Sequence, residues 1–198
     1  MNDRDRLMQL LVERSVRLGD FVLASGTRSD YYVDARRTTM SAEGQYLTGR
    51  VGLAAYQASG LNASHVGGLT MGADPVAYAM ARESFVAGCP LEAFSVRKAA
   101  KAHGTGQRIE GGLPEGSHCL VVEDSMTTGG SALAAIEALE AYGASVVGVL
   151  TLVDREEGGR KRLEAAGYPL VAVFTGAELL ARARARRPGA RGVPPGGA

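Results

Sequence analysis

The stretch from Cys119 to Ser131 constrains the fold of this chain more than any other. It reads Cys-Leu-Val-Val-Glu-Asp-Ser-Met-Thr-Thr-Gly-Gly-Ser, and its apolar start is typical of a buried strand in a parallel sheet. Glu123 and Asp124 come where that strand should end, and a loop of hydroxyl-bearing and glycine residues leads into a helix expected over 132–139. This order is typical of an anion site at the carboxyl end of a strand in an α/β protein.

The residue types of this loop indicate a phosphorylated sugar as the ligand. Glycines let the backbone approach a phosphate, and the start of a helix offers free N–H groups. Thr127, Thr128 and Ser131 add hydroxyl donors, while Glu123 and Asp124 can accept hydrogen bonds from a ribose diol. No Gly-x-x-x-x-Gly-Lys precedes the helix, and the acids precede the glycines, so a Walker loop and a dinucleotide fingerprint are both excluded. An ordinary strand–turn–helix connection with a solvated acid pair is the alternative.

The same stretch resembles the phosphoribosyl pyrophosphate (PRPP) motif of type I phosphoribosyltransferases. The resemblance implies an α/β fold in which helices flank a mostly parallel sheet and a small hood covers the strand ends. It implies Mg²⁺ as cofactor, held mainly by PRPP and water near the acid pair rather than by a protein ligand set. Asp124 is expected to be catalytic. The PRPP-binding residues implied by the motif are Glu123, Asp124, Ser125, Met126, Thr127, Thr128, Gly129, Gly130 and Ser131.

The N-terminal part predicts an amphipathic helix over 3–15, followed by a strand from position 21, a turn and a second strand ending at position 36. A small edge hairpin that packs on the domain and has only a structural role is the alternative. However, Phe-Val-Leu-Ala-Ser-Gly-Thr-Arg-Ser-Asp-Tyr-Tyr-Val-Asp-Ala-Arg resembles the hood motif of orotate phosphoribosyltransferases. Many bacterial members of that family have a lysine where this chain has Ala24.

The next segment predicts a helix over 42–58 capped by Ser41, a strand over 65–69, and a small-residue loop leading into a helix over 75–87. In the resembling family this loop faces the pyrophosphate of PRPP. Many members have a Tyr-Lys pair where this chain has Met71-Gly72, so that charge is missing here. A plain tight turn is the alternative.

A strand expected over 92–96 runs into a basic segment that ends in glycines. Its cations are Arg97, Lys98, Lys101 and His103. A solvated loop is one interpretation, but the segment resembles the catalytic loop of orotate phosphoribosyltransferases. The resemblance implies that all four bind PRPP and that Lys101 and His103 are catalytic. It also implies a homodimer with shared active sites, because in that family the loop reaches into the neighbouring subunit.

Arg155 follows a strand expected over 145–153, so it should face the same crevice as the acid pair. A surface ion pair with Glu156 or Glu157 is the alternative. The resemblance assigns Arg155 and Thr127 to orotate, and a planar guanidinium suits its carboxylate. A helix over 159–166, a strand over 169–174 and a helix over 177–187 complete the expected elements.

The chain is expected to form one domain over 1–187, with the hood at about 18–38 and a low-complexity tail over 188–198. The net charge of +1 gives no field that would favour nucleic acid, and the arginines of 181–198 lack aromatic neighbours. No signal peptide and no long apolar run is present, so we expect a cytoplasmic protein without membrane contact.

Together these resemblances imply a transferase that joins orotate to the phosphoribosyl group of PRPP, in pyrimidine nucleotide synthesis. Another base phosphoribosyltransferase is the first alternative, although a purine has no carboxylate for Arg155. A PRPP-sensing regulator of the same fold is the second, although too few residues precede the hood for a helix-turn-helix domain.

Overall fold

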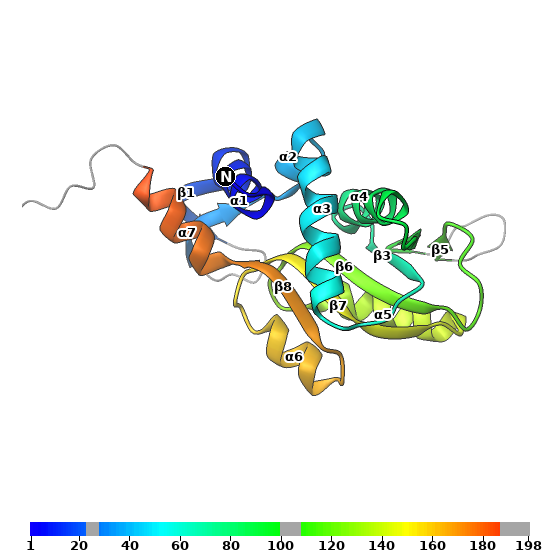
Figure 1. Ribbon diagram of the computed structural model, residues 1–198. Coiled ribbons are helices and arrows are strands. Elements are labelled where there is room, and N and C mark those ends of the chain that lie inside the picture. The colour runs from blue at the N-terminus through cyan, green and yellow to red at the C-terminus, as the bar shows by residue number, and fades with distance from the viewer. Residues whose placement is uncertain (23–27, 100–107, 187–198) are drawn as a thin grey trace, which may run out of the picture.

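A six-stranded sheet with the order β5-β4-β3-β6-β7-β8 forms the centre of the molecule in the computed structural model, which describes residues 1–22, 28–99 and 108–186 (Figure 1). Only β5 is antiparallel to its neighbour, so the prediction of a mostly parallel sheet is confirmed. The strands are β3 (His65–Leu69), β4 (Glu92–Val96), β5 (Ile109–Glu110), β6 (His118–Met126), β7 (Ser145–Asp154) and β8 (Leu170–Thr175).

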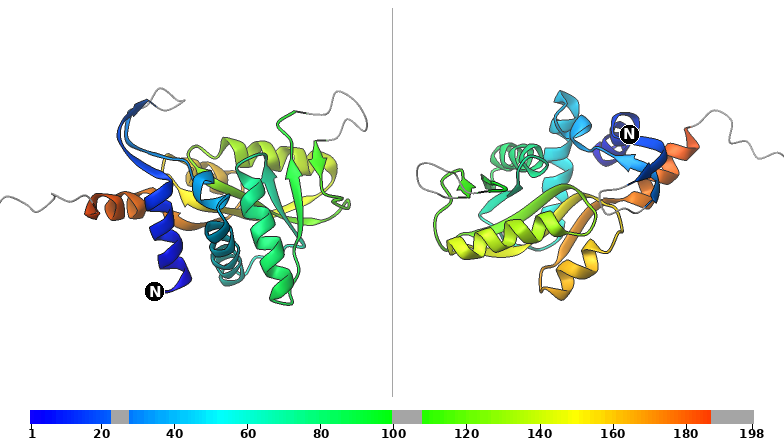
Figure 2. Two further views of the ribbon diagram at one scale, coloured as in Figure 1. Left: turned by 90° about the horizontal axis from the view of Figure 1, so that it is seen from above. Right: turned by 180° about the vertical axis from the view of Figure 1, so that it is seen from behind.

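Helices cover both faces of this sheet (Figure 2). Leu120 and Val122 of β6 belong to the core under the first group of helices, while Cys119 and Val121 belong to the core under the second. The central strand is therefore buried on both faces, as its continuous apolar run predicted. The first group is α1 (Asp3–Arg14), α3 (Ala42–Ala58), α4 (Ala73–Val86) and α7 (Gly176–Ala185), and the second is α5 (Gly130–Tyr142) and α6 (Gly159–Ala165).

The hood consists of β1 (Val16–Val22), β2 (Arg28–Val33) and the short helix α2 (Arg36–Thr39). A strand–turn–strand was predicted here, but its outer bounds were wrong. β1 begins directly after α1 because Val16 pairs with Val33. After Val33 the chain turns into α2 instead of continuing as a strand, since Thr38 is buried and its hydroxyl lies 2.7 Å from that of Ser15. Ala24 lies outside the described residues.

Strand β6 runs further than predicted, through the acid pair to Met126. It does so because it pairs with β7 along its whole length, and the last residue pair is Met126 with Asp154. The two acids therefore lie within the strand and not after it. Because successive side chains of a strand point to opposite faces, Glu123 and Asp124 face different sides of the sheet edge.

The other predicted elements are confirmed with small shifts at their ends. The hydroxyl of Ser41 accepts a hydrogen bond from the backbone N–H of Gly44 at 3.2 Å, which is the predicted cap of α3. In the described part of the chain, no helix combines the length and the apolar character needed to cross a membrane.

The antiparallel pair of β4 and β5 holds the two ends of the basic segment together. The backbone N–H of Arg97 donates to the carbonyl of Arg108 at 2.7 Å, and Nε of Arg108 donates to the carbonyl of Arg97 at 3.2 Å. Lys101 and His103 lie between them, within 100–107 and thus outside the described residues, as does the tail over 188–198.

Candidate active site

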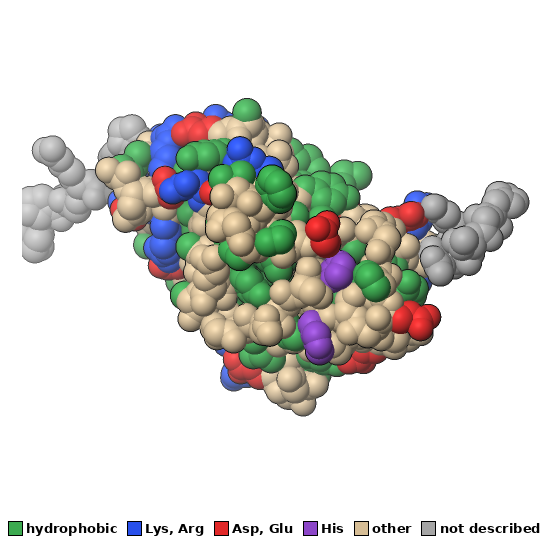
Figure 3. All heavy atoms as spheres, turned by 45° about the vertical axis from the view of Figure 1, so that its right-hand side comes forward, with side chains coloured by type: hydrophobic (Ala, Val, Ile, Leu, Met, Phe, Trp, Pro, Cys, Tyr) green, Lys and Arg blue, Asp and Glu red, His purple; other side chains and the backbone are tan. Residues whose placement is uncertain are grey.

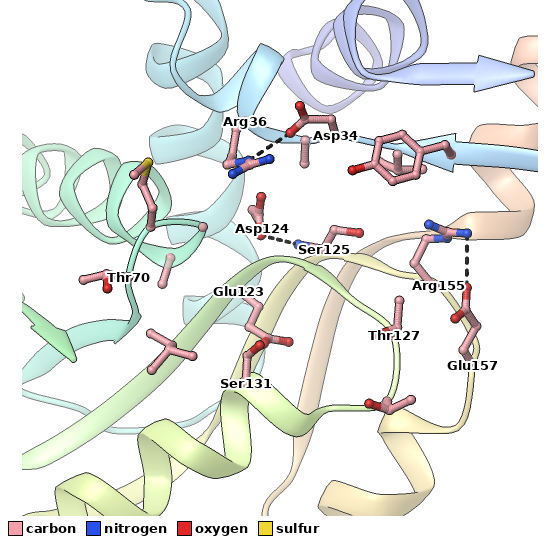
Figure 4. Close-up of a pocket in the computed structure, with 18 of the residues that line it drawn as sticks. Asp34, Arg36, Thr70, Glu123, Asp124, Ser125, Thr127, Ser131, Arg155 and Glu157 are labelled. Carbon is pink, nitrogen blue, oxygen red and sulfur yellow. Dashed lines mark hydrogen bonds and ion pairs between the residues drawn. The ribbon is translucent and has the colours of Figure 1, made fainter. Parts of the chain in front are cut away.

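A cavity of about 720 Å³ opens at the carboxyl ends of β3, β6 and β7, beneath the hood (Figure 4). Parallel strands bring their carboxyl ends to one edge, so residues far apart in sequence meet there. Eight of the residues singled out from sequence line the cavity: Lys98, Glu123, Asp124, Ser125, Thr127, Thr128, Ser131 and Arg155.

The loop between β6 and α5 is shaped by close backbone packing. Gly129 has a φ of 72°, a left-handed conformation that favours glycine. The N–H of Gly159, at the start of α6, donates to the carbonyl of Thr127 at 3.0 Å, and a Cβ on Gly159 would come within 2.6 Å of that oxygen. The loop is thereby held so that the Thr127, Thr128 and Ser131 side chains line the cavity at the start of α5, where the helix dipole favours an anion.

Glu123 is buried at 7% exposure and lies beside Ser131, on the α5 side of the strand (Figure 4). Burial and the neighbouring Asp124 raise the pKa of Glu123 to about 7, although hydrogen bonds from Ser131 and the backbone of Ala132 lower it. Within the described part of the chain, its Oε2 atom is buried and has no hydrogen-bond partner. This oxygen is therefore free to bind a ligand.

Asp124 points the other way, toward the hood and the turn before α4 (Figure 4). Its Oδ1 atom accepts a hydrogen bond from the backbone N–H of Ser125 at 2.9 Å. Burial raises the pKa of Asp124, and the Ser125 N–H and the charge of Arg36 act against this rise. A Cβ added to Gly72 would lie 2.5 Å from Oδ1, so only glycine lets this turn approach the carboxylate so closely.

Arg155 is 6% exposed and is held at the other end of the cavity. Its Nε atom donates to the hydroxyl of Tyr31 at 3.1 Å, and its Cζ atom lies 4.3 Å from the centre of the Tyr31 ring. Its Nη2 atom lies 3.1 Å from Oε1 of Glu157, close enough for an ion pair but without the alignment of a hydrogen bond. In the region that the structure describes, this buried donor makes no hydrogen bond, so it can still bind an acceptor group.

Other predicted residues lie elsewhere. Arg97 is exposed, pairs with Glu110 at 3.5 Å and does not line the cavity. The Met126 side chain is 1% exposed and belongs to the core under α5, so only its backbone could meet a ligand. Gly129 and Gly130 shape the loop without lining the cavity.

Several lining residues were not assigned to the site from sequence, among them Tyr32, Asp34, Arg36 and Glu157. Three of them come from the hood segment, where aromatic and charged residues alternate poorly with apolar ones. That irregularity was the available signal. Their direction could not be predicted, because it depends on how the hood packs over the sheet.

The fold and this cavity define a phosphoribosyltransferase. The family model described as the phosphoribosyl transferase domain matches residues 51–166, which include the acid pair and the loop before α5.

Similar proteins narrow the class. The chain is 45% identical to an orotate phosphoribosyltransferase of Aquifex aeolicus, over 91% of this chain and 99% of the relative. It is 50% identical to one of Streptomyces avermitilis, over 84% and 91%. The crystal structure of the Mycobacterium tuberculosis orotate phosphoribosyltransferase in complex with PRPP superposes with a TM-score of 0.74, at 40% identity and with 90% and 99% of the two chains covered. This chain belongs to the orotate phosphoribosyltransferase family.

Proposed function

We propose that this chain transfers the phosphoribosyl group of PRPP to orotate, giving orotidine 5-phosphate and pyrophosphate in pyrimidine (UMP) biosynthesis. The observation that carries the proposal is the position of Arg155 in the same cavity as the acid pair and the loop before α5. Orotate is a pyrimidine base with a carboxylate, and a guanidinium with a free buried donor suits that carboxylate. The names of the relatives support the same substrate.

The acid pair stabilises the sugar during the transfer. The bond from the anomeric carbon to the pyrophosphate oxygen breaks with its electron pair going to pyrophosphate. N1 of orotate forms the new bond and gives up its proton, which leaves with the pyrophosphate. Positive charge develops on the ribose, so the carboxylates of Glu123 and Asp124 favour the transition state and bind the ribose hydroxyls. We assign the catalytic role to Asp124, whose carboxylate lines the cavity beside the turn at Gly72.

The loop over 125–131 holds the 5-phosphate at the start of α5. Ser125, Thr127, Thr128 and Ser131 supply side-chain hydroxyls, while Met126, Gly129 and Gly130 supply backbone N–H groups. Thr127 lies below Arg155 in Figure 4, on the loop that leads to α5. We therefore assign it to the orientation of orotate as well. Fixing both reactants in one cavity removes much of the entropic barrier.

The residues present fit a magnesium ion that arrives with PRPP. In the described ranges, no group of three or more His, Cys, Asp or Glu side chains could hold a metal by itself. Mg²⁺ bound to phosphates typically uses one or two carboxylates and several waters. Glu123, with its free Oε2 atom, and Asp124 provide such carboxylates. When bound, Mg²⁺ would offset the negative charge of the departing pyrophosphate.

The basic segment supplies the cationic clamp on pyrophosphate through Arg97, Lys98, Lys101 and His103. Lys98 lines the cavity of its own chain. Arg97 pairs with Glu110 at the sheet edge and does not line that cavity. We therefore propose a homodimer in which Lys101 and His103 of one subunit act on the PRPP held by the other.

Exposed apolar side chains support an interface between subunits. Tyr78, Phe85 and Val86 on α4 are 49%, 76% and 63% exposed. Figure 3 shows hydrophobic side chains gathered toward the top of one face of the molecule, the level at which α4 lies in Figure 1. Exposed apolar patches of this kind are typical of protein–protein contacts. A cytoplasmic location, without membrane or nucleic-acid binding, stays a prediction.

The loss of orotate absorbance on adding PRPP and Mg²⁺ to the purified chain tests the proposal. We expect orotate to be consumed only when the chain, PRPP and Mg²⁺ are all present. The Asp124→Asn variant is the inactive control. Uracil and a purine base are assayed in parallel. Turnover of a purine without orotate would indicate another base phosphoribosyltransferase. Binding of PRPP without turnover of any base would instead favour a PRPP-sensing regulator.

A further inference from the structure

Helix α2 projects a cation over the cavity from the hood. The helix is anchored from below by Thr38, which is buried and donates to the carbonyl of Leu10 at 3.3 Å. Its first residue, Arg36, lines the cavity and points down toward Asp124 (Figure 4). The base of this side chain is therefore fixed by the core, while its charged end faces the site.

One interaction orients the guanidinium of Arg36. Its Nε atom donates to Oδ1 of Asp34 at 3.0 Å, and the Arg36 side chain is 45% exposed. Across residues 1–22, 28–99 and 108–186, no hydrogen bond involves its two terminal nitrogens. A single carboxylate thus holds the group in place and leaves two donors directed at the cavity.

The wall next to Arg36 has no charge of its own. Thr70, Met71 and Gly72 line it, and none of the three side chains is charged. The Asp124 carboxylate lies below Arg36 (Figure 4), and a Cβ on Gly72 would come within 2.5 Å of its Oδ1 atom. A polyanion bound here needs a cation from another element, since the carboxylate beside it is repulsive.

The geometry of the transfer directs the pyrophosphate to this end of the cavity. In a displacement at the anomeric carbon, the attacking base and the leaving group lie on opposite sides of that carbon. Orotate is assigned to Arg155, at one end, so the leaving group lies across the acid pair at the other (Figure 4). Among the described cations of the cavity, Lys98 and Arg36 remain for it.

We infer that Arg36 binds the pyrophosphate group of PRPP and of the product, and supplies the charge that the turn at Thr70–Gly72 lacks. The inference rests on the proposed function for the identity of the polyanion. Two parallel N–H groups of a guanidinium match phosphate oxygens, which makes Arg36 a substrate-binding residue as well as a neighbour of Asp124.

Binding of two small anions tests the assignment without relying on turnover. Inorganic pyrophosphate with Mg²⁺ and ribose 5-phosphate are titrated separately by calorimetry into wild type, Arg36→Gln and Arg37→Gln. Arg37 is exposed on the same short helix and does not line the main cavity, so Arg37→Gln is the matched control. For Arg36→Gln we expect pyrophosphate affinity to fall about tenfold or more, as for a lost charged hydrogen bond. Ribose 5-phosphate should bind within about twofold of wild type, and Arg36→Lys should restore part of the loss.

The outcomes separate this inference from the proposed function. Equal weakening of both anions would show that Arg36 acts through Asp124 or the fold, and unchanged pyrophosphate affinity would show no contact; either overturns the inference. A wild-type chain that turns over orotate, with Arg36→Gln unchanged in its KM for PRPP, overturns the inference alone. A wild-type chain that binds pyrophosphate through Arg36 but never consumes orotate overturns the proposed function alone.

Discussion

Arg155 and Tyr31 are 124 positions apart in sequence and form one unit in the structure, joined by a 3.1 Å hydrogen bond and by stacking of the guanidinium on the ring. The pair connects the hood to the carboxyl end of β7. The direction of the Arg155 donors therefore depends on where the hood lies, and each partner can be tested separately.

Tyr31→Phe keeps the ring under Arg155 and removes the hydroxyl that accepts from Nε. The loss of one hydrogen bond to a charged group weakens an interaction by about 1.5–3 kcal/mol. We expect the KM for orotate to rise by at least about fivefold, and the KM for PRPP to change little. Tyr46→Phe, on the exposed side of α3, is the control. Equal KM values for orotate in the two variants would contradict a role for Tyr31.

Arg155→Ala removes the group proposed to bind the orotate carboxylate. Loss of a partner for a buried charge costs about 2–5 kcal/mol, so the KM for orotate should rise strongly. The preference for orotate over uracil, which lacks the carboxylate, should narrow. Arg160→Ala, which breaks ion pairs with Asp154 and Glu164 nearby, is the matched control. Unchanged discrimination between the two bases would place the carboxylate site elsewhere, for instance near Arg36.

Glu157→Gln removes the charge that approaches Arg155 in the free protein. The carboxylate of orotate must compete with Glu157 for the same guanidinium. The variant should therefore bind orotate more tightly, with a KM lower by about twofold to fivefold, the range of a partly exposed ion pair. Glu156→Gln is the control, because its side chain accepts from the backbone of Ala177 instead. A raised KM in Glu157→Gln would mean that Glu157 contacts orotate directly.

Glu123 should make stability depend on pH. Its pKa is raised to about 7 in the folded chain, mainly by burial. At a pH between the ordinary pKa of a glutamate and 7, the folded state therefore holds a proton that the unfolded state releases. This contribution to stability is full at acid pH and is lost as pH rises toward 7, by up to about 3 kcal/mol. Glu123→Gln, which stays neutral, should lose less stability over this window.

Urea unfolding at several pH values between 4.5 and 8 measures this effect. Glu137→Gln, an exposed substitution on α5, controls for the change of one charge. Parallel stability curves for wild type and Glu123→Gln would disprove the raised pKa.

Subunit exchange tests the shared sites. Lys101→Ala and Asp124→Asn should each be inactive alone, since deleting a transition-state contact lowers turnover about 10²–10³-fold. In a mixed dimer with shared sites, one site carries both lesions and the other none, so activity should return. With random exchange the recovery approaches about a quarter of wild type, because half of the dimers are mixed and each has one intact site. A mixture that stays inactive, although a tag pull-down confirms exchange, would exclude sites shared across an interface.

The parts of this structure that depend on neighbouring residues were predictable, and those that depend on distant contacts were not. The apolar run before Glu123 and the Ser41 cap are local signals, and both predicted their elements. The helix at Arg36 was predicted as strand because the burial of Thr38 against Ser15 leaves no local trace. Likewise, the acids and hydroxyls could be assigned to the site from their order along the sequence. That Arg36 and Asp124 point toward each other could not be predicted, because it depends on how the hood packs on the sheet.

The strand pair at the sheet edge makes the basic segment exchangeable. Because β4 and β5 already hold Arg97 against Arg108, the sheet does not depend on what lies between them. Each doubling in the length of a flexible connection adds only about 0.6 kcal/mol to the free energy of closing it. A segment of different length or composition, taken from a relative, could therefore replace the one between Arg97 and Arg108 without changing the fold of the domain. Turnover can thus diverge among relatives while the scaffold that binds the sugar phosphate stays the same.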